Sequence, residues 1–304
     1  MDTKIKVTAF YKFIKLTPEN LSTVKSRLES AAETNGISGL IILAQEGANG
    51  TVAGSSEGLD LFKIAVKEIL SAERVIFKDS WTSKNPFRRF KIKVRDEIVS
   101  LGKPDIFPEQ QKNHHLTPSE WNKVLEQEDV VLIDTRNWYE TAVGVFENAI
   151  DPNIKAFNEF PQYLDDAKIP KEKKVLMYCT GGIRCEKALI EMQKRGYENV
   201  YQLEGGILKY LEEYPQGKFK GECFVFDHRV SVDGNLQPSK KYHLCAHCGD
   251  PGEEKLTCAN CGSLGKICAR CAQNPLLRTC SKNCSYHLSG CNPENLQNSK
   301  TLRE

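Results

Sequence analysis

The sequence predicts an α/β protein in three parts: a ferredoxin-like N-terminal domain, a domain with a doubly wound parallel sheet, and a small cysteine-rich metal-binding tail. Three observations support this fold class. Apolar segments of the first part follow the order strand, helix, strand, strand, helix, strand. In the middle part, fully apolar strands alternate with helices. Nine of the twelve cysteines fall between residues 245 and 291.

Changes of composition along the chain set the boundaries of these parts. The segment between the two α/β domains is polar and contains prolines, as linkers often do. We expect the following limits: 1–97 for the ferredoxin-like (acylphosphatase-like) domain, 98–116 for a linker, 117–216 for the parallel-sheet domain, 217–244 for a connecting segment, 245–291 for the cysteine-rich region and 292–304 for a tail.

In the N-terminal domain, helix caps and turn residues separate the apolar segments. Thr17 and either Ser55 or Ser56 are expected to cap two helices, because a hydroxyl at the N-cap accepts a free N–H of the first turn. A turn at 45–50 is expected to join two strands of a hairpin. Strands are expected at residues 5–16, 38–44, 51–53, 74–79 and 87–95.

The second α/β domain opens with Thr117-Pro118-Ser119-Glu120, a capping box with proline at the first helical position. His114 and His115, just before it, are expected to be solvated. The apolar run 130–134 is typical of a strand buried on both faces of a parallel sheet. Further strands are expected at 147–150, 175–178 and 200–203, and further helices at 157–164, after Arg184 and from Gly205.

The composition indicates a cytoplasmic protein without a membrane partner. No apolar run approaches the length of a membrane span, and the N-terminus lacks the hydrophobic core of a signal peptide. In the cytoplasm, cysteines favour metal binding or catalysis over disulfides. The net charge is +2, but it is +4 over residues 1–100, −6 over 101–237 and +4 over 238–304. A polyanion would therefore bind to the flanking parts rather than to the middle domain.

The segment from Lys174 through Cys179 to Arg184 has the pattern of a strand, a tight loop and the start of a helix. Backbone N–H groups in such a loop point inward, and the helix N-terminus adds partial positive charge. Arg184 adds a full charge. Because these groups favour thiolate over thiol, Cys179 is predicted to have a lowered pKa and to act as a nucleophile.

The length of this loop indicates which kind of group it can bind. Four residues, Thr180, Gly181, Gly182 and Ile183, separate Cys179 from Arg184. Cysteine phosphatases use a longer loop around a phosphate, so this one suits a terminal sulfur, carried as a cysteine persulfide. Cys185 either resolves such a persulfide, forms a disulfide with Cys179, or packs as a small residue against the sheet.

A basic segment lies near the end of the N-terminal domain. Between Trp81 and Arg95 there is no acidic residue, and a strand there would place Phe90, Ile92 and Val94 on one face and the basic residues on the other. This row of charge either contacts an RNA backbone or forms an ordinary solvated face. The candidate RNA-binding residues are Lys84, Arg88, Arg89, Lys91, Lys93 and Arg95.

Eight cysteines of the tail form four pairs with the spacing of metal ligands. Four pairs make two complete four-thiolate zinc sites, in which no position stays open for a substrate, so we expect a structural role. The spacing leaves two pairings open, consecutive or alternate, with His247, His287 and Cys291 as substitute ligands. The expected zinc ligands are Cys245, Cys248, Cys258, Cys261, Cys268, Cys271, Cys280 and Cys284.

Three motifs of the middle domain resemble the signatures of rhodanese domains, in which the active cysteine carries a persulfide. The resemblance implies a rhodanese domain over 117–216 and a supporting role for Asp134 beside the active loop. The motifs are Cys179-Thr-Gly-Gly-Ile-Arg-Cys-Glu-Lys187, Ile133-Asp134-Thr-Arg136 followed by Glu140 and Gly144, and Leu203-Glu-Gly-Gly-Ile207.

Together with Gly221-Glu-Cys-Phe-Val-Phe-Asp-His-Arg-Val230, these features make residues 1–240 similar to the bacterial rhodanese-domain tRNA uridine hydroxylases. The resemblance implies an oxidoreductase that uses molecular oxygen to convert the wobble uridine (U34) in the anticodon region of tRNA to 5-hydroxyuridine. It implies that Cys179 is the active cysteine. The electron donor is unknown, because the chain shows neither a dinucleotide-binding fingerprint nor a clear iron-binding triad.

Two other functions stay open at this point. The loop chemistry alone favours a sulfurtransferase that passes persulfide sulfur to tRNA or to another protein. A non-catalytic RNA-binding adaptor is the second alternative, although an adaptor has no need of the intact Cys179–Arg184 loop. For hydroxylation, we expect the Cys179 thiolate or persulfide to supply the nucleophilic or reducing step, and a sulfur or electron donor protein to be a partner.

Overall fold

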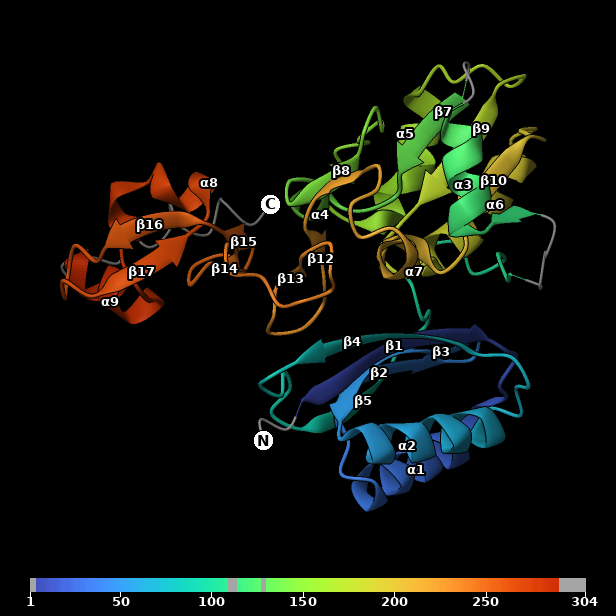
Figure 1. Cartoon of the computed structure of the whole chain (residues 1–304), viewed down its shortest axis with the longest axis horizontal. Helices are drawn as coiled ribbons and strands as arrows, with labels where there is room; N and C mark the ends of the chain where they lie inside the picture. The colour runs from blue at the N-terminus through green and yellow to red at the C-terminus, as the bar shows by residue number, and fades with distance from the viewer. Residues whose placement is uncertain (1–3, 109–113, 127–129, 290–304) are drawn as a thin grey trace. The chain divides into compact units, whose positions relative to one another are not determined.

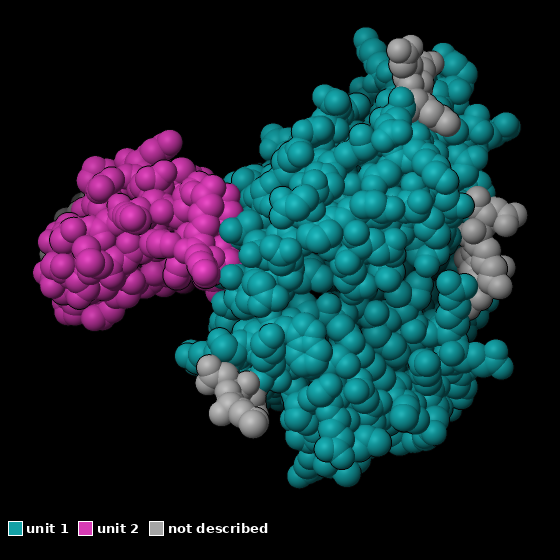
Figure 2. Space-filling model, viewed as in Figure 1, with its two compact units in different colours: residues 1–238 teal, residues 239–304 magenta. Residues whose placement is uncertain are grey.

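A computed structural model of the chain describes residues 4–108, 114–126 and 130–289. The chain divides into two compact units (Figure 2), unit 1 over Met1–Pro238 and unit 2 over Ser239–Glu304. Unit 1 contains a five-stranded sheet, a four-stranded sheet and two short strand pairs, and unit 2 contains two further strand pairs. In the described ranges, no helix combines the length and the apolar character needed to cross a membrane.

The first sheet has five strands in the order β4-β1-β3-β2-β5 (Figure 1). Pairing is antiparallel except between β2 and β5. The helices α1 (Pro18–Thr34) and α2 (Ser56–Ile69) cover one face, so the ferredoxin-like prediction is confirmed with β5 as an added edge strand. The strands are β1 (Ile5–Phe13), β2 (Ser38–Ala44), β3 (Gly47–Gly54), β4 (Ile76–Thr82) and β5 (Phe90–Val94).

Local signals explain most of these boundaries. The Thr17 and Ser55 hydroxyls accept backbone N–H groups of the first turns of α1 and α2. The hairpin turn is shorter than the predicted 45–50, because Gly47 already pairs with Ala44 across β2 and β3. The predicted apolar face of β5 also ends early, since Val94 is 44% exposed.

The segment between the two α/β domains packs onto them rather than crossing solvent. Leu101 and Ile106 are buried in the hydrophobic core of the second domain. The prediction that the adjacent histidines are solvated was wrong: both are half-buried. His114 Nδ1 lies 2.8 Å from the carbonyl oxygen of Val200, and His115 belongs to β6 (His115–Leu116), which pairs with β10.

The second sheet is parallel, with the order β6-β10-β9-β7. One hydrophobic cluster joins it to α5 and α6, and another joins it to α3 and α7, so helices cover both faces and the doubly wound prediction is confirmed. The elements are α3 (Pro118–Leu125), β7 (Val130–Asp134), η2 (Phe157–Glu159), α5 (Phe160–Asp166), β9 (Lys174–Tyr178), α6 (Ile183–Lys194), β10 (Val200–Leu203) and α7 (Gly206–Glu213).

One predicted strand of this domain lies elsewhere. Instead of 147–150, the structure has α4 (Trp138–Thr141) and then β8 (Gly144–Phe146), which pairs with β11 (Phe219–Gly221). Ile150 makes only an isolated bridge to Ile133. After β11, the hairpin of β12 (Cys223–Phe224) and β13 (Ser231–Val232) packs into the same hydrophobic cluster as α7.

Unit 2 consists of two small antiparallel strand pairs followed by short helices. Its few buried side chains are mostly cysteines, together with Leu256 and Ile267. So small an apolar core favours a metal-stabilised fold. The elements are β14 (His243–Leu244), β15 (Pro251–Gly252), β16 (Glu254–Thr257), β17 (Leu264–Ile267), α8 (Ala269–Ala272), η3 (Pro275–Leu277) and α9 (Lys282–Leu288).

Candidate active site and metal clusters

The active loop joins the carboxyl end of β9 to the N-terminus of α6, as predicted. Cys179 is fully buried directly after the strand. Gly182, at φ +96°, turns the chain into α6, and its N–H donates to Cys179 Sγ at 3.1 Å. The backbone N–H groups of Arg184 and Cys185, at the start of α6, further lower the pKa of this thiol. The loop therefore surrounds the sulfur with backbone donors, which stabilise a thiolate.

Gly206, the first residue of α7, allows the backbone of this helix to lie close to the active loop. It adopts a φ of +67°, and an added Cβ would lie 2.5 Å from the carbonyl oxygen of Cys179 and 2.7 Å from the amide nitrogen of Gly182. Only glycine fits at such a distance from two backbone groups. The Gly205-Gly206 pair of the third motif thus lets α7 approach the active loop closely.

The two cysteines of the loop differ in protonation. Burial would raise the pKa of Cys179, but hydrogen bonding from Cys185, the charge of Arg184 and the backbone donors together lower this pKa to about 6. Burial and the neighbouring Cys179 raise the pKa of Cys185 well above its ordinary value. At neutral pH, Cys179 is therefore a thiolate and Cys185 a thiol that donates to it.

The environment of Cys185 fits packing and hydrogen bonding at once. The side chain is fully buried in the core cluster between the sheet and α6. Its Sγ lies 3.5 Å from Thr135 Oγ1, and the Thr135 hydroxyl also donates to the Tyr178 carbonyl at 3.0 Å. The predicted packing role is consistent with this position, and the effect of Cys185 on the Cys179 pKa adds a second role.

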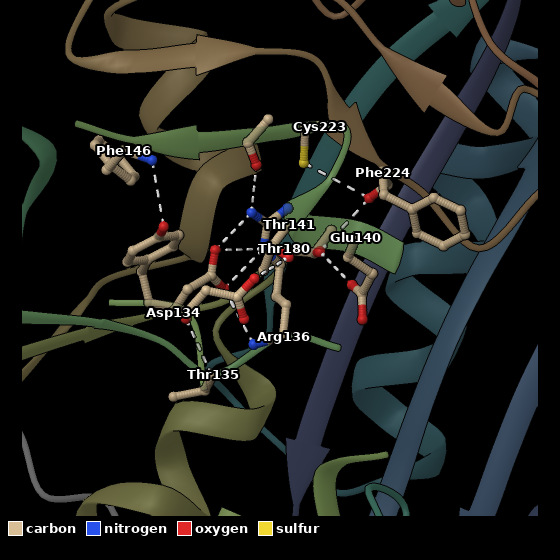
Figure 3. Close-up of polar contacts among 12 residues, drawn as sticks. Asp134, Thr135, Arg136, Glu140, Thr141, Phe146, Thr180, Cys223 and Phe224 are labelled. Atoms are coloured by element: carbon tan, nitrogen blue, oxygen red, sulfur yellow. Dashed lines mark hydrogen bonds and ion pairs between the residues drawn. The ribbon is translucent and has the colours of Figure 1, made fainter. Parts of the chain in front are cut away.

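The charge of Arg184 lowers the Cys179 pKa, as expected, but the side chain is also paired with a carboxylate. Its guanidinium forms two hydrogen bonds with the Glu140 carboxylate, at 2.6 and 2.7 Å, and both side chains are buried. Burial would raise the Glu140 pKa, but Arg184 lowers it below its ordinary value. Glu140 also accepts from the Thr180 hydroxyl at 3.3 Å (Figure 3), so it connects α4 to two residues of the active loop.

Asp134 supports the active loop indirectly, through Arg136. Its carboxylate accepts hydrogen bonds from the backbone and the guanidinium of Arg136 (Figure 3). Arg136 in turn donates to the Gly144 carbonyl at 2.6 Å. Burial would lower the Arg136 pKa, but Asp134 raises it above its ordinary value. The predicted supporting residue therefore fixes the chain between β7 and β8, and Glu140 makes the direct contact with the loop.

The N-terminal domain contributes side chains that the sequence did not connect with the active loop. Lys78, on β4, donates from Nζ to the Gly181 carbonyl at 2.9 Å. Tyr11, on β1, donates to the Glu186 carboxylate at 2.7 Å and lies next to Gly182. Both are separated from the loop by more than 100 residues in the sequence. No local motif predicts such contacts, because they depend on the packing of two domains.

The predicted RNA-binding residues lie along and before the edge strand β5. Five of the six side chains are exposed, and Lys93 is half-buried. In the described part of the chain, none of the six forms an ion pair with a carboxylate. The strand is at the edge of its sheet, so this row of positive charge remains available to a ligand.

Unit 2 brings the eight predicted cysteines into two clusters. In each cluster, the four sulfur atoms lie within 4.8 Å of one another, so each can hold a metal ion. The pairing is the alternate one of the two that the spacing allows. His247 bonds instead to the Thr279 carbonyl, and Cys291 lies outside the described residues. The clusters are Cys245, Cys248, Cys268 and Cys271, and Cys258, Cys261, Cys280 and Cys284.

Known protein families match this chain in three successive segments. An UPF0176 acylphosphatase-like domain matches residues 5–98, a rhodanese-like domain matches 117–213, and a rhodanase C-terminal segment matches 220–285. The first two agree with the two α/β folds of unit 1. The third spans the end of unit 1 and most of the cysteine-rich unit 2.

Curated relatives are similar over most of the chain. A tRNA uridine(34) hydroxylase of Bdellovibrio bacteriovorus is 52% identical over 285 residues, 93% of this chain and 81% of the relative. Relatives of the same name from Synechocystis and Acaryochloris marina are 43% and 42% identical, over 81% and 80% of this chain and 88% and 78% of their own. The chain belongs to the family of the tRNA uridine(34) hydroxylases.

Proposed function

We propose that this protein hydroxylates uridine 34 of tRNA at C5, with molecular oxygen as co-substrate. The observation that carries the proposal is the buried Cys179, whose pKa is lowered to about 6, in a chain that is 52% identical to a tRNA uridine(34) hydroxylase. A thiolate at neutral pH is the nucleophile that an electron-poor pyrimidine ring requires. The adaptor alternative gives no reason for such a thiolate.

The chemistry begins with addition of the Cys179 thiolate to C6 of the uracil ring. This makes C5 electron-rich, so C5 can bond to one oxygen atom of O2 and form a hydroperoxide. A thiol-class reductant supplies two electrons, which with two protons release the distal oxygen as water and leave a hydroxyl on C5. Loss of the C5 proton and expulsion of the thiolate restore the C5–C6 double bond and give 5-hydroxyuridine.

Cys179 is fully buried, so the uridine must leave the anticodon stack and the loop must open before this attack. The backbone donors of the loop then hold the sulfur in place, and Glu140 holds Arg184 and Thr180. Because no step uses the metal clusters, the reacting groups all come from unit 1 and the external reductant.

The deciding experiment is nucleoside mass spectrometry of unmodified tRNA treated with the protein, a thiol reductant and heavy-oxygen gas. The heavy isotope is needed because adding oxygen and replacing oxygen by sulfur change the nominal mass equally. Heavy oxygen in the modified uridine supports hydroxylation. Full hydroxylation by Cys179→Ala would refute the thiolate mechanism, while Cys179→Ser distinguishes a need for sulfur from a need for side-chain volume.

A sulfurtransferase is the second candidate, favoured by the four-residue loop around Cys179, which suits a terminal sulfur. Its product would carry a sulfur isotope pattern without the heavy oxygen. In that case the partner would be a sulfur donor protein, whereas hydroxylation calls for an electron donor. The same mass spectrum therefore separates the two activities.

We also propose that the basic row on β5 binds the tRNA backbone in its anticodon region. Exposed lysines and arginines without carboxylate partners release counterions when they contact phosphates, so affinity falls as salt rises. Replacing Lys91, Lys93 and Arg95 with glutamate should weaken the affinity for tRNA at least tenfold. The same change should reduce the slope with which this affinity falls as salt rises. A control reversal of Lys25, which pairs with Glu29 on α1, should change little; equal affinities of the two variants would contradict this surface.

For unit 2, we propose two structural zinc ions. Four closely spaced thiolates are the ligand set that zinc prefers, and a complete set excludes a substrate from the metal. We place the protein in the cytoplasm, where tRNA is available and where unpaired cysteines persist. Metal analysis of the purified chain should give two zinc ions per molecule.

A further inference from the structure

The environment of Lys78 is unusual for a lysine. The side chain lies on β4 of the ferredoxin-like domain and is only 2% exposed. Its Nζ donates to the Gly181 carbonyl at 2.9 Å and lies 4.5 Å from the centre of the Tyr11 ring. Hence an ammonium group from one domain is enclosed against the active loop of the other.

Lys78 also lacks the partner that other buried lysines have. Lys187 pairs with Glu46 and Glu97, and Lys6 pairs with Asp60 at 2.7 Å. No carboxylate among the described residues lies within ion-pair distance of Lys78 Nζ. A buried ammonium without a counter-charge is costly, because burial removes its hydration. The positive charge of Lys78 must therefore be balanced by an anionic group other than a directly bonded carboxylate.

The charges around the active loop identify that group. Arg184 is balanced by Glu140, and the Arg136 guanidinium by Asp134. The charge of Arg184 acts on Cys179 but is also balanced by Glu140, whereas no carboxylate among the described residues pairs with Lys78. The acidic groups that face Lys78 are Cys179, Glu186 and Glu212, together with the Tyr11 hydroxyl, which Glu186 already engages.

We infer that Lys78 is the counter-ion of the Cys179 thiolate, a positioning residue that the ferredoxin-like domain supplies to the rhodanese active loop. Its hydrogen bond to Gly181 fixes the ammonium at the loop backbone, where it acts on the sulfur through space. The inference concerns the protonation state of Cys179, so it does not depend on which substrate the thiolate attacks. It also gives the N-terminal domain a part in catalysis besides RNA binding.

The protonation of Lys78 is consistent with this role. Burial lowers its pKa to about 8, while the negative charge of Cys179 acts most strongly in the opposite direction, ahead of Glu186 and Glu212. Electrostatic coupling is reciprocal, so each member of the pair must stabilise the charge of the other. Each partner therefore offers an independent measurement.

The first measurement is the rate of alkylation of Cys179 by iodoacetamide as a function of pH, followed by peptide mass spectrometry on the intact chain. Lys78→Met should move the midpoint of the rate profile upward by about one pH unit, since a nearby opposite charge lowers the pKa of a thiol. Lys78→Arg should keep the midpoint near that of the original protein. An unchanged midpoint in Lys78→Met would overturn the inference.

The matched control is Lys63→Met, because Lys63 lies in the same domain but pairs with Asp79 at 2.6 Å. This variant should leave the Cys179 midpoint unchanged; an equal shift would show that the effect is nonspecific and would overturn the inference. Methionine is close to lysine in length, and an apolar side chain at the buried position 78 should not destabilise the fold.

The second measurement leaves Lys78 in place and does not depend on reagent access to the buried sulfur. The titration of Lys78 is followed by NMR of chains with isotope-labelled lysine, with the signal assigned by its loss in Lys78→Arg. Replacing Cys179 with alanine removes the negative charge, so the pKa of Lys78 should fall below its value in the original protein. An unchanged titration would refute the pairing even if every variant folds.

Discussion

Removing the carboxylate of Glu140 should destabilise unit 1 strongly. In Glu140→Ala, the Arg184 guanidinium stays buried but loses both hydrogen bonds to its partner, at 2.6 and 2.7 Å. The Thr180 hydroxyl and the Asn137 N–H lose an acceptor as well. Because the uncompensated charge cannot reach water, we expect a loss of about 3 to 5 kcal/mol in the free energy of unfolding.

A surface pair in the same domain gives the matched comparison. Arg195 also makes two hydrogen bonds to one carboxylate, that of Asp165, but the Asp165 side chain is 57% exposed. Asp165→Ala should therefore cost no more than about 1 kcal/mol. The difference between the two variants reflects burial, the Thr180 and Asn137 hydrogen bonds that Glu140→Ala also removes, and the Glu191 carboxylate that Arg195 keeps in Asp165→Ala.

The assay is urea unfolding followed by tryptophan fluorescence, because all three tryptophans lie in unit 1. The folded-state pKa of Glu140 is lowered, so its contribution is present above the ordinary carboxyl pKa and is lost as the pH falls through the lowered value. The gap between Glu140→Ala and the original protein should narrow on acidification. A loss as small as that of Asp165→Ala at neutral pH would refute the reasoning.

Three further predictions concern the loop and the tail. Gly206→Ala should abolish the reactivity of Cys179 in the alkylation assay, because the added Cβ would lie 2.5 Å from the Cys179 carbonyl oxygen. Gly262→Ala is the control: Gly262 has a similar positive φ but open space around it, so this variant should keep the reactivity of Cys179. Cys185→Ser should keep the Cys179 pKa low and Cys185→Ala should raise it, since serine still donates a hydrogen bond; equal alkylation profiles would contradict this role. Cys268→Ser should halve the zinc content and make unit 2 sensitive to protease, while unit 1 keeps its urea midpoint; full zinc retention would contradict the cluster assignment.

The local parts of the site were predictable from the sequence because they depend on neighbouring residues. The apolar strand before Cys179, the glycines after it and the helix start at Ile183 all lie within one short segment, and the structure has each of them in place. The C-x-x-C spacing of three pairs and the C-x-x-x-C spacing of the fourth likewise predicted the eight cysteines that form the two clusters. Spacing alone could not choose between consecutive and alternate pairing, because that depends on how the two strand pairs of unit 2 pack.

The missed parts depend on contacts between distant segments. Glu140 belongs to a motif that resembles rhodanese domains, but its pairing with Arg184 joins residues 44 positions apart. Lys78 and Tyr11 were read as ordinary strand residues, because nothing near them in the sequence points to the active loop. The segment 98–116 has the polar composition of a linker, yet its apolar residues Ile98, Leu101 and Ile106 are buried.

The alternate pairing of the cysteines in unit 2 has a consequence for a chain that is cut within it. A break between Cys261 and Cys268 would leave two cysteines of each cluster on either side of the cut. Metal ions bound at the two clusters would then bridge the two fragments, as a pair of disulfides would do in an oxidising compartment. A tail cut at this position should thus stay assembled until a chelator removes the metal. The two fragments should then separate from each other.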